Sequence, residues 1–126
     1  MRFHDFHLDK YEVSNFGENI GFHLIFDYPG QKREESFITF SEVALYHFIH
    51  VSPTIILDIV EISIAEIINE WGAKISEWNR MHGVSLWADT LENYCNRLQS
   101  EGYKAWRIES SIGFYGFVIA KRVSNA

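Results

Sequence analysis

The chain has 126 residues and a formal net charge of −6, and 47% of its residues are hydrophobic and 16% aromatic. This composition excludes a disordered chain, and the acidic balance argues against general nucleic-acid binding, which requires a basic surface. The charge instead suits a protein partner with a basic surface. The length predicts a single domain, residues 1–126, with its own hydrophobic core.

Cysteine content and hydropathy bear on the compartment. Cys95 is the only cysteine and cannot form an internal disulfide, so a reducing environment is expected. The first residues carry charge where a signal peptide needs an apolar run. The apolar stretch at residues 55–68 is interrupted by acidic residues, so no membrane span is expected. We therefore predict a cytoplasmic protein that does not enter a membrane.

The first part of the chain predicts a β-hairpin. Residues Phe3–Val13 and Ile20–Tyr28 alternate between the two faces of a strand, and the turn-forming residues 15–19 join them. Pro29 and Gly30 then predict a tight turn, because proline presets φ and glycine accepts a positive φ.

Further strands are predicted before the first helix, at Phe37–Phe40, Val43–Val51 and Thr54–Ile62. The strand at Val43–Val51 is apolar on both faces, which favours a central position in the sheet. Ser52 and Pro53 follow it. Because proline cannot donate a hydrogen bond to a sheet, we expect the strand to end there.

The residues from Ser63 to His82 predict the first helix. Ser63 and Glu66 stand at the spacing of a capping box, in which each side chain can satisfy a free backbone N–H. Helical spacing then places one narrow stripe on a single face: Ile64, Ile68, Trp71, Ile75, Trp78 and His82. A stripe with two tryptophans needs a large apolar surface to cover, and the strands can supply it.

Gly72 lies in the middle of this helix, where glycine costs about 1 kcal/mol relative to alanine. A residue without a side chain lets another element approach closely. The second helix is the first candidate, because a short connection favours antiparallel neighbours. The alternative is a symmetric dimer contact that buries the same edge of the helix.

A second helix is predicted from Ser85, which can act as its N-cap, to about Glu101. The final strands are predicted at Tyr103–Glu109 and Phe114–Val123. The predicted fold is α+β: an antiparallel sheet of about seven strands, in the chain order five strands, two helices, two strands, with both helices packed on one face.

Two parts of the chain resemble known proteins. One is Phe37–Val43 with the strand and helix at Ile55–Glu70, and the other is Gly102–Glu109 followed by Gly113–Ala120. Together they are similar to small uncharacterised α+β proteins of bacteria, cyanobacteria among them. Some broadly similar small acidic proteins are immunity partners of bacterial toxins, so the resemblance implies a role of that kind. No functional residue is carried over from it.

Polar side chains on the first hairpin form the sharpest candidate site. Alternate residues of a strand point the same way, so Asp9 shares a face with His7, and pairing would bring His23 and Asp27 opposite them. Histidine and carboxylate ligands suit zinc, iron or manganese. The alternative is a solvent-facing polar side of an antiparallel sheet. The metal candidates are His7, Asp9, His23 and Asp27.

Other residues with chemical potential favour structural roles. His47 and His50 lie in an apolar strand without a carboxylate partner in the sequence, and Cys95 lies at the edge of a helical stripe rather than at a helix start. Trp87, at the junction of the helices, and Trp106, on the final hairpin, are candidates for a partly exposed interaction patch.

The sequence contains no catalytic constellation, so the leading hypothesis is a non-enzymatic binding or protein-interaction domain. We expect it to use no cofactor and to exist as a monomer or a homodimer. A narrower alternative is an immunity-type protein that neutralises a basic bacterial toxin by charge complementarity. A second alternative is a metal-dependent enzyme centred on the first hairpin.

Overall fold

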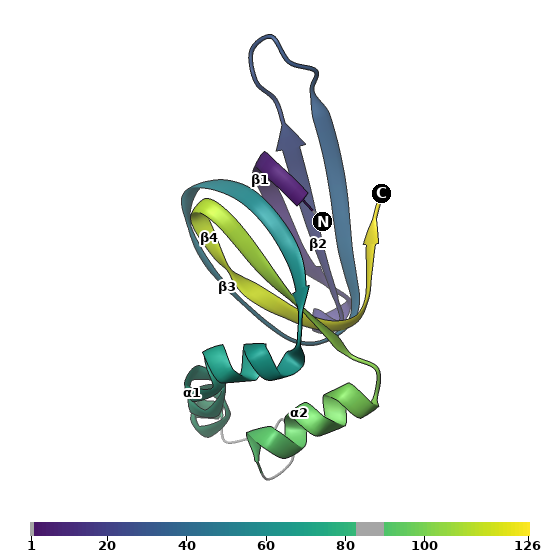
Figure 1. Ribbon diagram of the computed structural model, residues 1–126, viewed down its shortest axis with the longest axis vertical. Helices are drawn as coiled ribbons and strands as arrows, with labels where there is room; N and C mark the ends of the chain where they lie inside the picture. Colours follow the sequence, from purple (N-terminus) through teal and green to yellow (C-terminus); the bar gives the residue numbers. More distant parts are fainter. Residues whose placement is uncertain (1, 83–89) are drawn as a thin grey trace.

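The computed structural model describes residues 2–82 and 90–126, which form one antiparallel sheet and two helices (Figure 1). The helices are α1 (Ile64–His82) and α2 (Leu91–Ser100). A 3-10 turn, Asn15–Gly17, joins the first two strands. The strands are β1 (Arg2–Ser14), β2 (Asn19–Phe26), β3 (Glu34–Ile62) and β4 (Lys104–Asn125).

The expectation of about seven strands in the order five, two helices, two is wrong. The sheet has four strands, because the three strands predicted between Phe37 and Ile62 are all β3 and the last two are both β4. The predicted breaks are register shifts inside a continuous β3–β4 pair, the largest between His50 and Ile55. Residues that favour turns therefore bend these long strands instead of ending them.

Gly113 makes the bend in β4 possible. Its φ is +83°, and a Cβ at this position would lie 1.9 Å from the backbone oxygen of Pro53. Only glycine combines this backbone conformation with so close an approach to the neighbouring strand. The β3–β4 ribbon thus turns sharply where Pro53 and Gly113 meet.

β3 covers parts of both edges of the β1–β2 hairpin. Its first residues pair with β2, from Phe26 opposite Glu34 to Asn19 opposite Ser41. Later residues pair with the outer edge of β1, where His7 lies opposite Ile55. To reach both edges, β3 and β4 curl side by side through the wide curve in Figure 1. The sheet thus closes on itself around an interior.

Apolar side chains from all four strands fill this interior. The buried members of this inner core are Phe3, Ile20, Phe22, Leu24, Ile38, Phe40, Ile56, Ile59, Trp106, Ile108, Phe114, Val118 and Ala120. Aromatic rings meet there edge to face, as Phe22 and Phe40 do at 5.9 Å. Burial of these side chains is the main force that holds the curl closed.

Both helices pack against the other face of β4, and this helix layer forms a second cluster. Its buried members are Ile64, Ile67, Trp71, Ile75, Tyr94, Cys95, Leu98, Ala105, Phe117 and Ile119. The predicted stripe is rotated slightly, because Ile67 is fully buried while Ile68 is only half-buried. The Ser63 half of the predicted capping box is present, since the Ser63 hydroxyl accepts a hydrogen bond from the Glu66 N–H at 3.1 Å. The Glu66 carboxylate accepts a hydrogen bond from the Ser63 hydroxyl at 3.4 Å.

The short approach predicted at Gly72 is confirmed within the chain. A Cβ on Gly72 would lie 3.3 Å from Cδ1 of Leu91 in α2, so the two helices meet at this position. α2 begins at Leu91, where the Thr90 hydroxyl accepts a hydrogen bond from the Asn93 N–H at 3.1 Å. The predicted N-cap Ser85 lies outside the described residues.

Candidate functional site

The structure brings together part of the predicted metal site. Asp9 occupies a bulge in β1, between Leu8 opposite Leu24 and Lys10 opposite His23. This placement brings its carboxylate to 2.9 Å from Nδ1 of His23. A bulge re-aims one side chain without ending the strand, so the contact between Asp9 and His23 depends on an irregularity that alternation does not reveal.

Other contacts hold His23 as a packed residue. Its ring stacks on Phe37 at 4.5 Å with an interplanar angle of 2°. Its Nε2 lies 3.3 Å from Oε1 of Glu35, in a geometry that does not satisfy a hydrogen bond. The Glu35 carboxylate in turn lies 3.1 Å from Arg33. The guanidinium thus offsets the charge of the carboxylate on the Nε2 side of the His23 ring.

The remaining two metal candidates lie elsewhere. The His7 ring lies 5.4 Å from the ring of Tyr28, and the Asp27 carboxylate lies 3.7 Å from Arg33. Within residues 2–82 and 90–126, no group of three or more histidine, cysteine or acidic side chains is arranged to hold a metal ion. The four candidates thus separate into one contacting pair and two side chains with other neighbours.

The tryptophan candidates fall in two different places. Trp106 is 4% exposed and points into the inner core, where its ring lies 5.3 Å from that of Phe40. The expected partial exposure of Trp106 is therefore wrong, because the curl of the sheet buries the inner face of β4 at this point. Trp87 lies outside the described residues.

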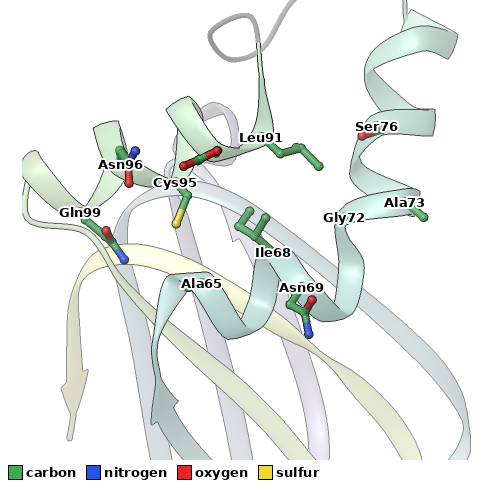
Figure 2. Close-up of a pocket in the computed structure, with 11 residues that line it drawn as sticks. Ala65, Ile68, Asn69, Gly72, Ala73, Ser76, Leu91, Cys95, Asn96 and Gln99 are labelled. Atoms are coloured by element: carbon green, nitrogen blue, oxygen red, sulfur yellow. The ribbon is translucent and has the colours of Figure 1, made fainter.

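A groove of about 600 Å³ runs between α1 and α2 (Figure 2). Ile68, Leu91 and Cys95 point into the space between the helices, and small side chains on α1 leave it open. Burial, and to a lesser degree the charge of Glu92, raise the pKa of the Cys95 thiol. A protonated thiol is a poor nucleophile, so the groove offers volume without an activated group.

Large apolar side chains are exposed at the bend of the β3–β4 ribbon. Ile112 and Tyr115 of β4 are 48% and 43% exposed, and Ile49 and Val51 of β3 are 47% and 65% exposed. A hollow of about 370 Å³ lies among them. Tyr115 stacks on Trp71 with 5.5 Å between ring centroids. At the bend, exposed apolar side chains thus lie directly beside the buried residues of the helix layer.

Acidic side chains stand beside this apolar bend, around a single cation. Arg107 of β4 hydrogen-bonds to Glu70 of α1, and it lies 3.9 Å from Glu66 and 3.6 Å from Glu109. The Tyr115 hydroxyl lies 3.5 Å from the second oxygen of Glu70. We call Glu66, Glu70, Glu109, Ile112 and Tyr115 the acidic–apolar surface.

The electrostatics of this surface follow from its excess of carboxylates. Burial alone would lower the pKa of Arg107. Its hydrogen bond to Glu70 and the negative charge of that carboxylate together outweigh this effect, so the pKa lies above its ordinary value. Burial, reinforced by the negative charge of Glu70, raises the pKa of Tyr115. Three carboxylates around one permanent cation leave a net negative charge beside exposed apolar groups.

His47 lies on the same face of the ribbon, under α1. Its ring lies 5.3 Å from that of Trp71 and 4.7 Å from that of Trp78. Burial, with a smaller contribution from the charge of Lys74, lowers the pKa of His47. The neutral ring is therefore favoured, and the histidine acts here as an aromatic packing residue, as its apolar strand suggested.

Sequence reasoning did not find the acidic–apolar surface. Its residues come from α1 and from both sides of the bend in β4, and no short spacing connects them. A partial signal was present, because Arg107, Glu109 and Tyr115 are polar or amphipathic residues in a strand whose other side chains are mostly apolar. The pairing with Glu66 and Glu70 required the helix to be placed.

No protein-family model matches the chain, and neither the curated proteins nor the solved structures contain a significant match. Among the described residues, no helix is both long and apolar enough to cross a membrane.

Proposed function

We propose that this chain is a non-enzymatic binding domain whose acidic–apolar surface contacts a protein with a basic surface. One observation carries the proposal: Glu66, Glu70 and Glu109 are grouped around a single Arg107, beside two exposed side chains of β4. These are Ile112 and Tyr115. Apolar groups supply contact area, and surrounding carboxylates select and orient a basic partner.

The charge of the whole chain supports the same partner. A net charge of −6 attracts a basic protein from a distance and accelerates its encounter. Complementary charge mainly raises the association rate, and apolar contact then slows dissociation. Binding of this kind is expected to weaken as salt is added, because screening acts on the exposed carboxylates.

A narrower form of the proposal is an immunity-type protein that neutralises a basic bacterial toxin in the cytoplasm. Cys95 is a free and buried thiol, which suits a reducing compartment. A metal-dependent enzyme on the first hairpin has less support, because only Asp9 and His23 of its four residues are in contact.

The proposal is tested by calorimetric titration of the purified chain with each basic protein encoded beside its gene. One of these proteins is expected to bind, and the variant Glu66→Gln/Glu109→Gln/Ile112→Ser is expected to weaken that binding by at least about tenfold. The control is Glu34→Gln/Glu101→Gln/Phe16→Ser, which removes the same charge and one exposed apolar side chain elsewhere. The proposal fails if none of the proteins binds, or if both variants lose affinity equally.

A further inference from the structure

The middle of β3 has an unpaired edge. Next to β2, the last contact is the hydrogen bond from the Val43 N–H to the Glu18 oxygen at 3.0 Å. Next to β1, contact resumes where the Thr54 hydroxyl approaches the Leu8 oxygen at 3.3 Å. Between these points, the described residues pair β3 with β4 alone. We call residues 44–53 of β3 the open edge.

The open edge carries little of the protection that usually blocks strand pairing. Natural sheets guard their edges with charged side chains, prolines and bulges. Here the bulge between Val43 and Leu45 and the proline at position 53 lie only at the two ends. Ile49 and Val51 are exposed between them. A strand edge of this kind is a template for another strand.

Charge decides which strand fits. The residues from Val43 to Pro53 contain no aspartate, glutamate, lysine or arginine, although 22% of the whole chain is charged. A basic partner would find no carboxylate along this edge. Two copies of this acidic chain, by contrast, would meet here with the least like-charge repulsion.

We infer that the open edges of two copies of this chain pair antiparallel and form a symmetric dimer. Antiparallel pairing of identical edges is self-complementary, so each copy fills the free edge of the other and the assembly stops at two. The pairing joins the two sheets into one and brings Ile49 and Val51 into cross-strand contact. This inference does not rest on the proposed function, whose surface is formed by α1 and β4.

Sedimentation equilibrium over a range of concentrations tests the inference. The wild-type chain is expected to reach twice its mass of 14.8 kDa. The variant Ile49→Lys/Val51→Lys is expected to raise the dimer dissociation constant by at least about tenfold, because lysines on a strand edge oppose pairing. Added salt is expected to tighten the wild-type dimer, because it screens the repulsion between two acidic chains.

The matched control is Val13→Lys/Phe37→Lys. These side chains are 41% and 48% exposed, and Phe37 lies on β3 itself, where backbone hydrogen bonds to Ala126 and pairing to β2 cover both edges. The control is expected to dimerise as the wild type does. Thermal unfolding of both variants checks that they remain folded.

Amide hydrogen exchange locates the contact. Exchange of residues 44–53 is expected to slow as the wild-type concentration rises, with little change in β1 and β2. A wild-type chain that stays monomeric at every concentration overturns the inference. So does an equal loss of association in both lysine variants, or concentration-dependent protection confined to the helices.

Discussion

The β1–β2 hairpin and the middle of the β3–β4 ribbon are built from similar alternating strands, yet their surroundings differ. The hairpin has β3 along parts of both edges and turns one face into the inner core. The ribbon has an open edge at residues 44–53 and exposes large apolar side chains at its bend. Beside the helix layer, Tyr115 stacks on Trp71 and is still 43% exposed.

This difference locates the binding surfaces. On the hairpin, where β3 pairs with parts of both edges, the polar side chains Asp9 and His23 contact one another. The ribbon is longer than the elements that cover it. Its exposed apolar side chains lie beside the helix layer, and its open edge lies between the parts of β3 that pair with the hairpin. Both proposed contacts use these uncovered parts of the ribbon.

The largest expected effect tests whether α1 covers the ribbon through Trp71. Replacing Trp71 by alanine is expected to lower the free energy of unfolding by about 3–5 kcal/mol, because the ring is 6% exposed and lies 5.3 Å from that of Phe117. Glu77→Ala, on the exposed side of α1, is expected to change it by less than about 0.5 kcal/mol. Equal effects in a denaturant titration would show that the covered face of α1 is misplaced.

A smaller effect on stability tests whether the groove between α1 and α2, and not the open edge, is a contact between two copies. Gly72→Leu is expected to lower the free energy of unfolding by about 1–3 kcal/mol, because the new side chain meets Leu91. The mass in solution is expected to stay as in the wild type, since the contact lies within one chain. Light scattering measures the mass. If this variant dissociated a dimer, the dimer contact would lie at the groove between α1 and α2 and not at the open edge of β3.

The N-terminal cap of α1 lies where β3 of the ribbon passes into the helix layer, and its contribution to stability can be measured. Ser63→Ala is expected to lower the free energy of unfolding by about 0.5–2 kcal/mol, because the Glu66 N–H loses its acceptor. Ser63→Asp retains an acceptor and is expected to restore most of this loss. A denaturant titration in which serine, alanine and aspartate behave alike would show that the cap does not stabilise the helix.

The smallest expected effect is a pH dependence from His47, which lies under the helix layer. Burial, then Lys74, hold its pKa below the ordinary value of 6.5. The unfolded chain therefore binds the proton first as the pH falls, so stability is full above 6.5 and declines as the pH drops through the lower folded value. His47→Gln is expected to reduce this decline in thermal unfolding, whereas His4→Gln, on an exposed side chain, is expected to preserve it.

Local signals predicted the helical part of the fold well. The cap at Ser63, the packed position of Trp71 and the close approach at Gly72 were read from spacing within one helix and a short connection to the next, and all are present. The number of strands could not be predicted in the same way. The same proline and glycine residues suit a turn between strands and a bend within one, and the partner strand decides between them.

The candidate site shows the same limit. Alternation on two strands placed His7, Asp9, His23 and Asp27 on one face, but the bulge at Asp9 shifts the register, and only the pair of Asp9 and His23 is in contact. Trp106 was expected near the surface because it was placed on a hairpin close to the edge of the sheet. Its burial follows from the curl of β3 and β4, which no local pattern encodes.

The sequence by itself determined the acidic charge, the antiparallel alternation and the apolar face of α1, because each depends on composition or on spacing within one element. The tertiary structure alone decided that β3 curls far enough to reach both edges of the hairpin. It also decided that Arg107 meets Glu66 and Glu70 across the gap between β4 and α1. These features join residues far apart in the chain, and the energies that select them arise only when the elements pack.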